Sequence, residues 1–219
     1  MSLHLQRDLD QLKKELLQLG TMVEASFTNA MLVLHERRID VVEKVFEDEK
    51  LIDEREVWIE ESCLKILALH QPVAVDLRFI VVALKVNNDL ERMGDLAVNI
   101  VKRATTLAEL APLSTPQDFI GRMPEIISDM INGSLDALVK LDVDLARTII
   151  EMDDAVDDIN RKMYETLRAQ MENDSQTVER AIEFLSTSRY MERIADLATN
   201  IAEDVIFLVD GEVVRHQVI

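Results

Sequence analysis

Apolar residues recur along almost the whole chain at intervals of three and four positions, the pattern of amphipathic α-helices. One such stripe begins at Val41 and ends at Leu67, and another begins at Val86 and ends at Ala104. No segment shows the alternation of apolar and polar residues that is typical of a strand. Each stripe needs an apolar partner surface, so we expect an all-α protein whose helices pack on one another.

The stripes are interrupted five times, which divides the chain into six expected helices. The interruptions fall at 37–40, 71–72, 111–118, near 142 and at 173–175. Asp40, followed three residues later by Glu43, resembles a capping box. Thr115 is placed to cap a helix that Pro116 begins.

An internal repeat of about a hundred residues organises these helices. Residues 89–100 read DLERMGDLAVNI and residues 190–201 read YMERIADLATNI, a shift of 101 positions. Upstream, 39–53 matches 143–157 at a shift of 104. We therefore expect two tandem, pseudo-symmetric three-helix bundles, at 1–109 and 119–219. The proline-containing segment 110–118 would be the linker between them.

The charge of the chain narrows the classes of partner. The 42 acidic residues outnumber the 24 basic ones, and the resulting charge of −18 repels nucleic acids and anionic lipid surfaces.

The apolar run 79–86 is too short to span a bilayer and contains Lys85, and residues 1–20 are too charged for a signal peptide. Cys63 is the single cysteine, which suits a reducing compartment. These features predict a cytoplasmic protein that binds neither nucleic acid nor membrane.

Candidate chemistry lies in acidic pairs spaced i, i+4, which place two carboxylates on one face of a helix about one turn apart. Four pairs occupy matching positions in the two repeats: Glu49 with Asp53, Glu91 with Asp95, Asp153 with Asp157, and Glu192 with Asp196. Asn99 and Asn200 continue the third-helix faces by one more turn. Carboxylates are natural ligands of hard cations, so the spacing suggests a cation bridging the second and third helices of each bundle.

Spacing alone leaves a plainer interpretation open. In a chain with 42 acids among 219 residues, roughly eight such pairs arise by chance. The acids could form a solvated stripe in which Arg92 and Arg193 make local salt bridges. The matching register in both repeats is what favours a metal site.

Other catalytic arrangements have little support. His4, His35, His70 and His216 are scattered, and none follows an acid by three residues as in ferritin-like di-iron enzymes. The chain has no glycine-rich phosphate loop, and Cys63 lies within an apolar stripe. We therefore expect a protein that is not an enzyme.

Two segments resemble the PhoU family. Residues 71–100 read QPVAVDLRFIVVALKVNNDLERMGDLAVNI, with a Gln-Pro turn, Asp-Leu-Arg and then Glu-Arg-x-x-Asp, and residues 190–205 read YMERIADLATNIAEDV. The acidic pairs that begin at Glu49 and Asp153 stand where the family has its second-helix motif. Gly94 of the first motif is replaced by Ala195 in the second, which removes no carboxylate.

The resemblance implies two three-helix bundles set end to end, with metal ions or clusters, iron or zinc, bound by the paired motifs. It also implies a regulator that reports phosphate status between the phosphate ABC transporter and a two-component sensor kinase. Such a regulator restrains phosphate uptake and the phosphate-starvation response, and its partners would be the transporter's ATPase, the kinase and a second copy of itself. The alternatives from the residues alone are a carboxylate-bridged metalloenzyme and a plain helical scaffold.

Overall fold

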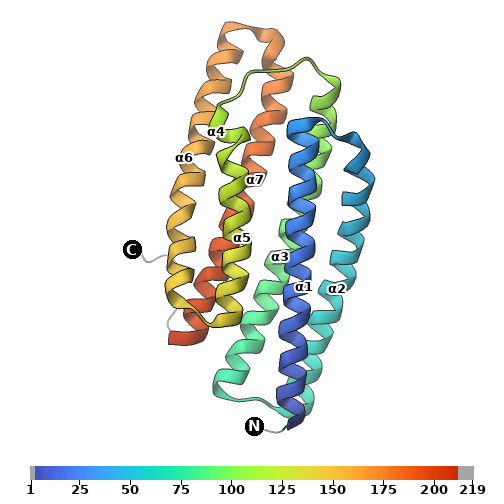
Figure 1. Ribbon diagram of the computed structural model, residues 1–219, viewed down its shortest axis with the longest axis vertical. Coiled ribbons are helices and arrows are strands. Elements are labelled where there is room, and N and C mark those ends of the chain that lie inside the picture. Colours follow the sequence, from blue (N-terminus) through green and yellow to red (C-terminus); the bar gives the residue numbers. More distant parts are fainter. Residues whose placement is uncertain (1–2, 212–219) are drawn as a thin grey trace.

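A computed structural model describes residues 3–211 and shows helices joined by short connections (Figure 1). In chain order these are α1 (Leu3–Glu36), η1 (Ile39–Val41), α2 (Val42–His70), α3 (Ala74–Glu109), α4 (Gln117–Ile120), α5 (Arg122–Lys140), α6 (Val143–Asn173), η2 (Ser175–Thr177) and α7 (Val178–Asp210). Six of them are long, as the apolar stripes predict, and α4 is a short helix ahead of α5. Within residues 3–211 none of the helices could cross a membrane, because none is both long enough and apolar enough.

Each break in the helical pattern has a local cause. Gln71 and Leu141 have positive φ values of 46° and 55°, which turn the chain at the ends of α2 and α5. Asp142 then caps α6, since its Oδ1 accepts a hydrogen bond of 3.0 Å from the backbone N–H of Leu145. Residues 110–116, between α3 and α4, are not helical.

Two expected helix caps are wrong. Asp40 lies inside the 3₁₀ turn η1 and accepts hydrogen bonds from Arg38, so α2 begins without a side-chain cap. The helix near Pro116 begins one residue later, at Gln117, so the N-cap is Pro116 and the Thr115 hydroxyl caps nothing. In both places the helix begins one residue later than the sequence pattern predicts.

The helices form two layers (Figure 1). Helices α2, α3, α7 and α6 lie side by side in that order, and α1 and α5 pack together over one face of α3 and α7. The first bundle is α1, α2 and α3, and the second is α5, α6 and α7, with a single hydrophobic core continuous through both. Phe27 and Phe119 are among its largest fully buried side chains.

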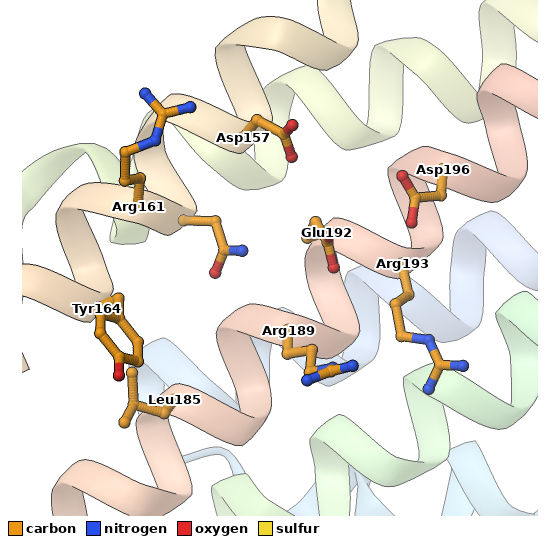
Figure 2. A pocket seen from close by; sticks show the side chains of 9 residues that line it. Asp157, Arg161, Tyr164, Leu185, Arg189, Glu192, Arg193 and Asp196 are labelled. Carbon is orange, nitrogen blue, oxygen red and sulfur yellow. The ribbon is translucent and has the colours of Figure 1, made fainter. Parts of the chain in front are cut away.

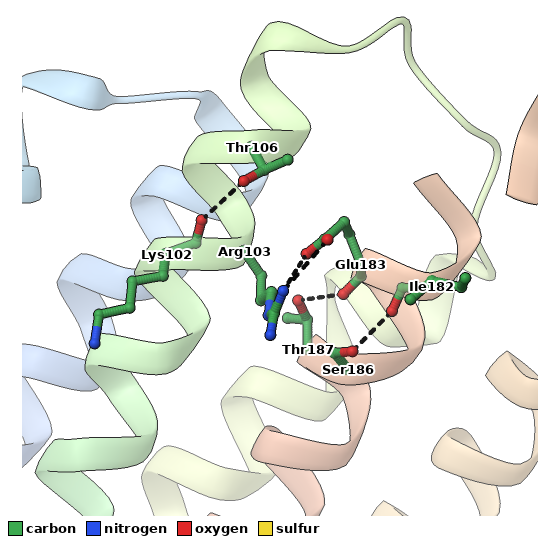
Figure 3. Close-up of polar contacts among 7 residues, drawn as sticks. All are labelled: Lys102, Arg103, Thr106, Ile182, Glu183, Ser186 and Thr187. Atoms are coloured by element: carbon green, nitrogen blue, oxygen red, sulfur yellow. Dashed lines mark hydrogen bonds and ion pairs between the residues drawn. The ribbon is translucent and has the colours of Figure 1, made fainter. Parts of the chain in front are cut away.

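The two bundles lie side by side and not end to end, which corrects the expected arrangement. Helices α3 and α7 run antiparallel along the shared boundary. Lys85 Nζ lies 2.8 Å from Asp204 Oδ1 near one end, and Arg103 Nη1 lies 3.3 Å from Glu183 Oε2 near the other (Figure 3). Contact along the full length of both helices buries more apolar surface than contact at bundle ends.

Candidate functional site

The eight predicted carboxylates lie on the four helices of one layer. Glu49 and Asp53 are on α2, Glu91 and Asp95 on α3, Asp153 and Asp157 on α6, and Glu192 and Asp196 on α7. Helices α1 and α5 cover the opposite side of α3 and α7. The acidic pairs of both repeats therefore share one open face of the molecule.

In the first repeat the structure brings Asp53 of α2 close to Glu91 and Asp95 of α3. Partial burial raises the pKa of Asp53, and the negative charge of Asp95 raises it further. Burial also raises the pKa of Glu91, with added repulsion from Asp95, Asp53 and Glu56. Glu49, one turn before Asp53 on α2, is not among the charges that raise either value. Three of the four predicted carboxylates thus form a mutually repelling group.

Glu56 belongs to this acidic group although the acidic pairs did not include it. Burial raises the pKa of Glu56, and repulsion from Glu60 and Asp53 adds to the effect. The buried Asn87 amide donates to the Glu56 backbone carbonyl at 3.0 Å and to its Oε1 at 3.3 Å. Glu56 lies three residues after Asp53 on the same helical face, and this spacing is the signal that could have identified it.

In the second repeat all four predicted carboxylates interact. Burial raises the pKa of Asp153 to about 7, with repulsion from Asp196, Asp157 and Glu192 adding to the shift. Burial and the neighbouring acids also raise the pKa values of Glu192 and Asp196. Asp153 Oδ1 is buried and has no hydrogen-bond partner in the part of the chain that the structure describes. Buried carboxylate oxygens normally accept a hydrogen bond or bind a cation, so this oxygen is a candidate cation ligand.

A cleft of about 680 Å³ opens beside this second group (Figure 2). We call it the C-terminal cleft; its lining residues are Asp157, Asn160, Arg161, Tyr164, Leu185, Arg189, Glu192, Arg193 and Asp196. Asp157 extends from α6, while Glu192 and Asp196 extend from α7 toward the same opening. Arg189 and Arg193 lower the pKa of Glu192, which partly offsets the effect of burial.

A second cleft, of about 400 Å³, joins the acidic faces of the two repeats between α3 and α7. It is lined by residues paired at the repeat shift of 101: Arg92 with Arg193, Asp95 with Asp196, Leu96 with Leu197 and Asn99 with Asn200. Arg193 and Asp196 line both clefts. The acidic faces of the two repeats are therefore continuous on the surface.

The local salt bridges expected from the plainer interpretation are weak. Arg92 Nη1 lies 4.0 Å from Asp89 Oδ1, the outer limit for an ion pair, and the Arg92 side chain is half exposed. Arg193 acts mainly on Glu192 and Asp196, whose pKa values it lowers. The arginines therefore reduce the repulsion among the carboxylates without removing it.

The side-chain positions do not form a finished coordination shell. Within residues 3–211, no three His, Cys, Asp or Glu side chains converge closely enough to hold a metal ion. The donor chemistry nevertheless fits a hard cation, because both groups consist of carboxylates and one carboxylate oxygen, on Asp153, is buried and unpartnered. Holding an ion would require these side chains to turn toward one another.

The cysteine and the described histidines show no sign of a catalytic role. Burial raises the pKa of the Cys63 thiol to about 12, so this cysteine is unreactive at neutral pH. His70 Nε2 lies 2.9 Å from Asp8 Oδ2, and the His35 ring is partly buried, which lowers its pKa. His216 lies outside the described residues.

Comparison with known proteins identifies the family. The family model described as the PhoU domain matches twice, at residues 16–104 and 120–205. The chain belongs to the PhoU family. The two matches correspond to the two repeats, and PhoU membership makes the chain an accessory regulator and not an enzyme.

Curated PhoU relatives align over nearly the whole chain. The phosphate-specific transport system accessory protein PhoU homolog of Aquifex aeolicus is 37% identical, over 96% of this chain and 95% of the relative. The phosphate-specific transport system accessory protein PhoU of Escherichia coli is 32% identical, over 95% of this chain and 86% of its own length.

Solved PhoU structures share the fold. The crystal structure of PhoU from Pseudomonas aeruginosa superposes with a TM-score of 0.89 at 32% identity, covering 94% of this chain and 99% of that one. The phosphate transport system regulatory protein PhoU from Streptococcus pneumoniae gives a TM-score of 0.87 at 25% identity, covering 95% and 98%. The all-helical, two-repeat fold predicted from the sequence is confirmed.

Proposed function

We propose that this chain is a metal-binding adaptor that reports phosphate status between a phosphate ABC transporter and a sensor kinase. In this role it restrains phosphate uptake and the phosphate-starvation response when phosphate is plentiful. The observation that carries the proposal is the pair of carboxylate groups, one per repeat, held in mutual repulsion on one open face. Repulsion of this kind costs stability unless a cation offsets it.

Each repeat supplies four carboxylates for a cation. Glu49, Asp53, Glu91 and Asp95 would hold it in the first repeat, and Asp153, Asp157, Glu192 and Asp196 in the second. A set made only of oxygen donors favours hard metals, iron among them, over a structural zinc site built from Cys and His. Zinc is the other candidate that the family resemblance suggests. In either case the bound ion supplies positive charge to the acidic face.

The proposed partners follow from the names of the relatives and from charge. The relatives are accessory proteins of phosphate-specific transport systems, so we place this chain with the transporter's ATPase and a sensor kinase in the cytoplasm. The charge of −18 favours a basic partner surface. Exposed apolar side chains such as Leu69 and Val73 also support self-association as a homodimer.

The experiment removes the first-repeat motif. The variant Glu91→Ala with Asp95→Ala should fold cooperatively, because both side chains lie at the surface of α3 and not in its core. It should lose about half of the metal found by elemental analysis of metal-replete protein. It should also pull down less transporter ATPase or kinase and derepress phosphate-starvation genes in a high-phosphate culture.

A matched control distinguishes loss of the motif from loss of two negative charges elsewhere on the surface. Glu43 and Glu47 form an exposed i, i+4 pair on α2 away from the acidic face, so Glu43→Ala with Glu47→Ala should keep metal, partner binding and repression. If the motif variant folds without first-repeat metal yet binds partners and represses like the wild type, the adaptor role does not depend on the motif. If wild-type protein takes up no metal, the carboxylates are an acidic surface only.

A further inference from the structure

The acidic groups of the two repeats have different surroundings. The repeat register aligns α6 with α2 at a shift of 104 and α7 with α3 at a shift of 101. Of the polar residues lining the C-terminal cleft, Asp157, Glu192, Arg193 and Asp196 have identical counterparts in the first repeat. The rest of the polar lining does not: Asn160 replaces Glu56, Arg161 replaces Val57, Tyr164 replaces Glu60, and Arg189 replaces Asn88.

These replacements change the charge around the carboxylates. In the first repeat Glu56 and Glu60 add negative charge, and Glu60 raises the pKa of Glu56. In the second repeat Arg161 and Arg189 add positive charge, and the aligned positions carry no additional acid. The first repeat therefore suits a cation alone, whereas the second combines carboxylates with guanidinium groups.

The guanidinium groups of the C-terminal cleft are available to a ligand. Arg189 and Arg193 lie one turn apart on α7, extend to the same side of the helix (Figure 2), and form no ion pair within residues 3–211. Arg161 points outward and pairs with Asp158 at 2.8 Å, but both side chains are more than 60% exposed. Ion pairs between side chains this exposed are weak, so Arg161 can turn into the cleft at little cost.

We infer that the C-terminal cleft binds a tetrahedral oxyanion, of the phosphoryl class, together with a cation on the second-repeat carboxylates. Arg189 and Arg193 would bind the anion's oxygens, with Arg161 and the Tyr164 hydroxyl closing the rim. Guanidinium groups suit this ligand because their paired N–H donors match two oxygens of a phosphoryl group. The inference rests on the proposed metal binding and assigns the ligand class to one repeat only.

Charge makes the two ligands depend on one another. The three arginines that line the cleft match the charges of its three lining carboxylates, Asp157, Glu192 and Asp196, and Asp153 beside them is a fourth acid. Without a cation the cleft therefore has no positive excess to hold an anion. A divalent cation on those carboxylates frees the arginines and leaves a positive excess. By linkage, an oxyanion that binds only the cation-loaded cleft tightens cation binding by the same factor. The first repeat should show no such coupling.

The test measures Mn²⁺ affinity by electron paramagnetic resonance of the free ion, with and without millimolar inorganic phosphate. The protein is the full chain carrying Glu91→Ala and Asp95→Ala, so that only the second repeat binds. Phosphate should tighten Mn²⁺ binding about tenfold, a typical coupling between two sites. Replacing Arg189 by Asn, the residue at the aligned first-repeat position, should bring the ratio of the two affinities close to one.

Two controls and one comparison complete the design. Arg147→Asn removes an exposed arginine of α6 outside the cleft and should keep the phosphate effect. Protein carrying Asp153→Ala and Asp157→Ala retains the first repeat and should bind Mn²⁺ without a phosphate effect. O-phosphoserine replaces phosphate in a parallel titration: an equal effect means that the phosphoryl group of a larger molecule is accepted, and a smaller one means that free phosphate is preferred.

The outcomes separate this inference from the metal proposal. If the second repeat binds no Mn²⁺, the metal proposal fails for that repeat. If Mn²⁺ binds but phosphate leaves its affinity unchanged, the metal proposal stands and the oxyanion site is wrong. An Arg189→Asn variant that keeps the full phosphate effect also overturns the site.

Discussion

Replacing Asp153 by Asn should stabilise the metal-free protein, and by an amount that depends on pH. Burial and the neighbouring acids raise the pKa of Asp153 from 3.8 to about 7 in the folded chain. Asn has nearly the same shape as a protonated Asp and stays neutral. The substitution therefore removes the cost of ionising this carboxyl in its partly buried position.

The sign and size of the effect follow from the pKa. Between pH 3.8 and about pH 7 the folded state holds a proton on Asp153 that the unfolded state has lost, so stability falls as pH rises. Each pH unit in this window removes up to about 1.4 kcal/mol, and the whole shift corresponds to at most about 4 kcal/mol. Because neighbouring acids share the repulsion, we expect a gain of roughly 2–4 kcal/mol above pH 7 and almost none near pH 4.

Urea unfolding in the presence of chelator, at several pH values between 4 and 8, measures this difference. Urea is preferred to guanidinium because it does not screen the charges. Glu165→Gln removes an equal charge at an exposed site on the same helix and should change stability by only a few tenths of a kcal/mol at every pH. Parallel pH curves for wild type and Asp153→Asn would show that Asp153 ionises normally and that its surroundings are not those described.

Two further predictions concern a packing contact and a buried ion pair. A Cβ added at Gly94 would lie 3.2 Å from Ile52 Cδ1, an atom that Ile52→Val removes. In a double-mutant cycle, the combined variant Gly94→Ala and Ile52→Val should be less destabilised than the sum of the two single variants, by about 1 kcal/mol. Additive effects would mean that Ile52 moves freely. Lys85→Met removes an ion-pair partner of the buried Asp204 and should cost about 2 kcal/mol in urea unfolding, less than for a fully buried pair because Lys85 is itself 39% exposed. Arg38→Met at an exposed pair should cost much less, and equal costs would contradict the role of burial.

The Gly94 contact also explains a difference between the repeats. Where the first repeat has Gly94 against Ile52, the second has Ala195, and the repeat register aligns Val156 with Ile52. Compared with the first repeat, the second repeat has one more methyl group on its third helix and one fewer on its second helix. A departure that looked like a change in the motif is thus consistent with conserved packing volume.

The sequence predicted what depends on spacing within a helix. The number of long helices, the repeat and the shared face of the acidic pairs all follow from the 3.6-residue period, which decides the direction in which each side chain points. The second-repeat group beginning with Asp153 formed as expected for that reason. The metal ligands and the domain boundaries stay predictions.

What the sequence could not predict depends on choices between helices. An apolar stripe shows that a helix needs a partner but not which one, so the side-by-side packing of α3 on α7 was missed. The cap predicted at Asp40 is wrong because the Asp40 carboxylate accepts hydrogen bonds from Arg38. The difference between Arg189 and Asn88, in contrast, is visible in the repeat alignment. Its importance becomes clear only from the structure, which shows that Arg189 lines the cleft.

The ion pairs between α3 and α7 also decide which bundle can associate with which. The facing surface of the first bundle carries Lys85 and Arg103, and that of the second carries Glu183 and Asp204. In the repeat register Arg103 and Asp204 are equivalent positions, so two first bundles joined in this way would set Lys85 against Arg103. Two second bundles would set Glu183 against Asp204. Like bundles therefore repel and unlike bundles attract, so the charges at this boundary favour a first bundle against a second bundle over two bundles of the same kind.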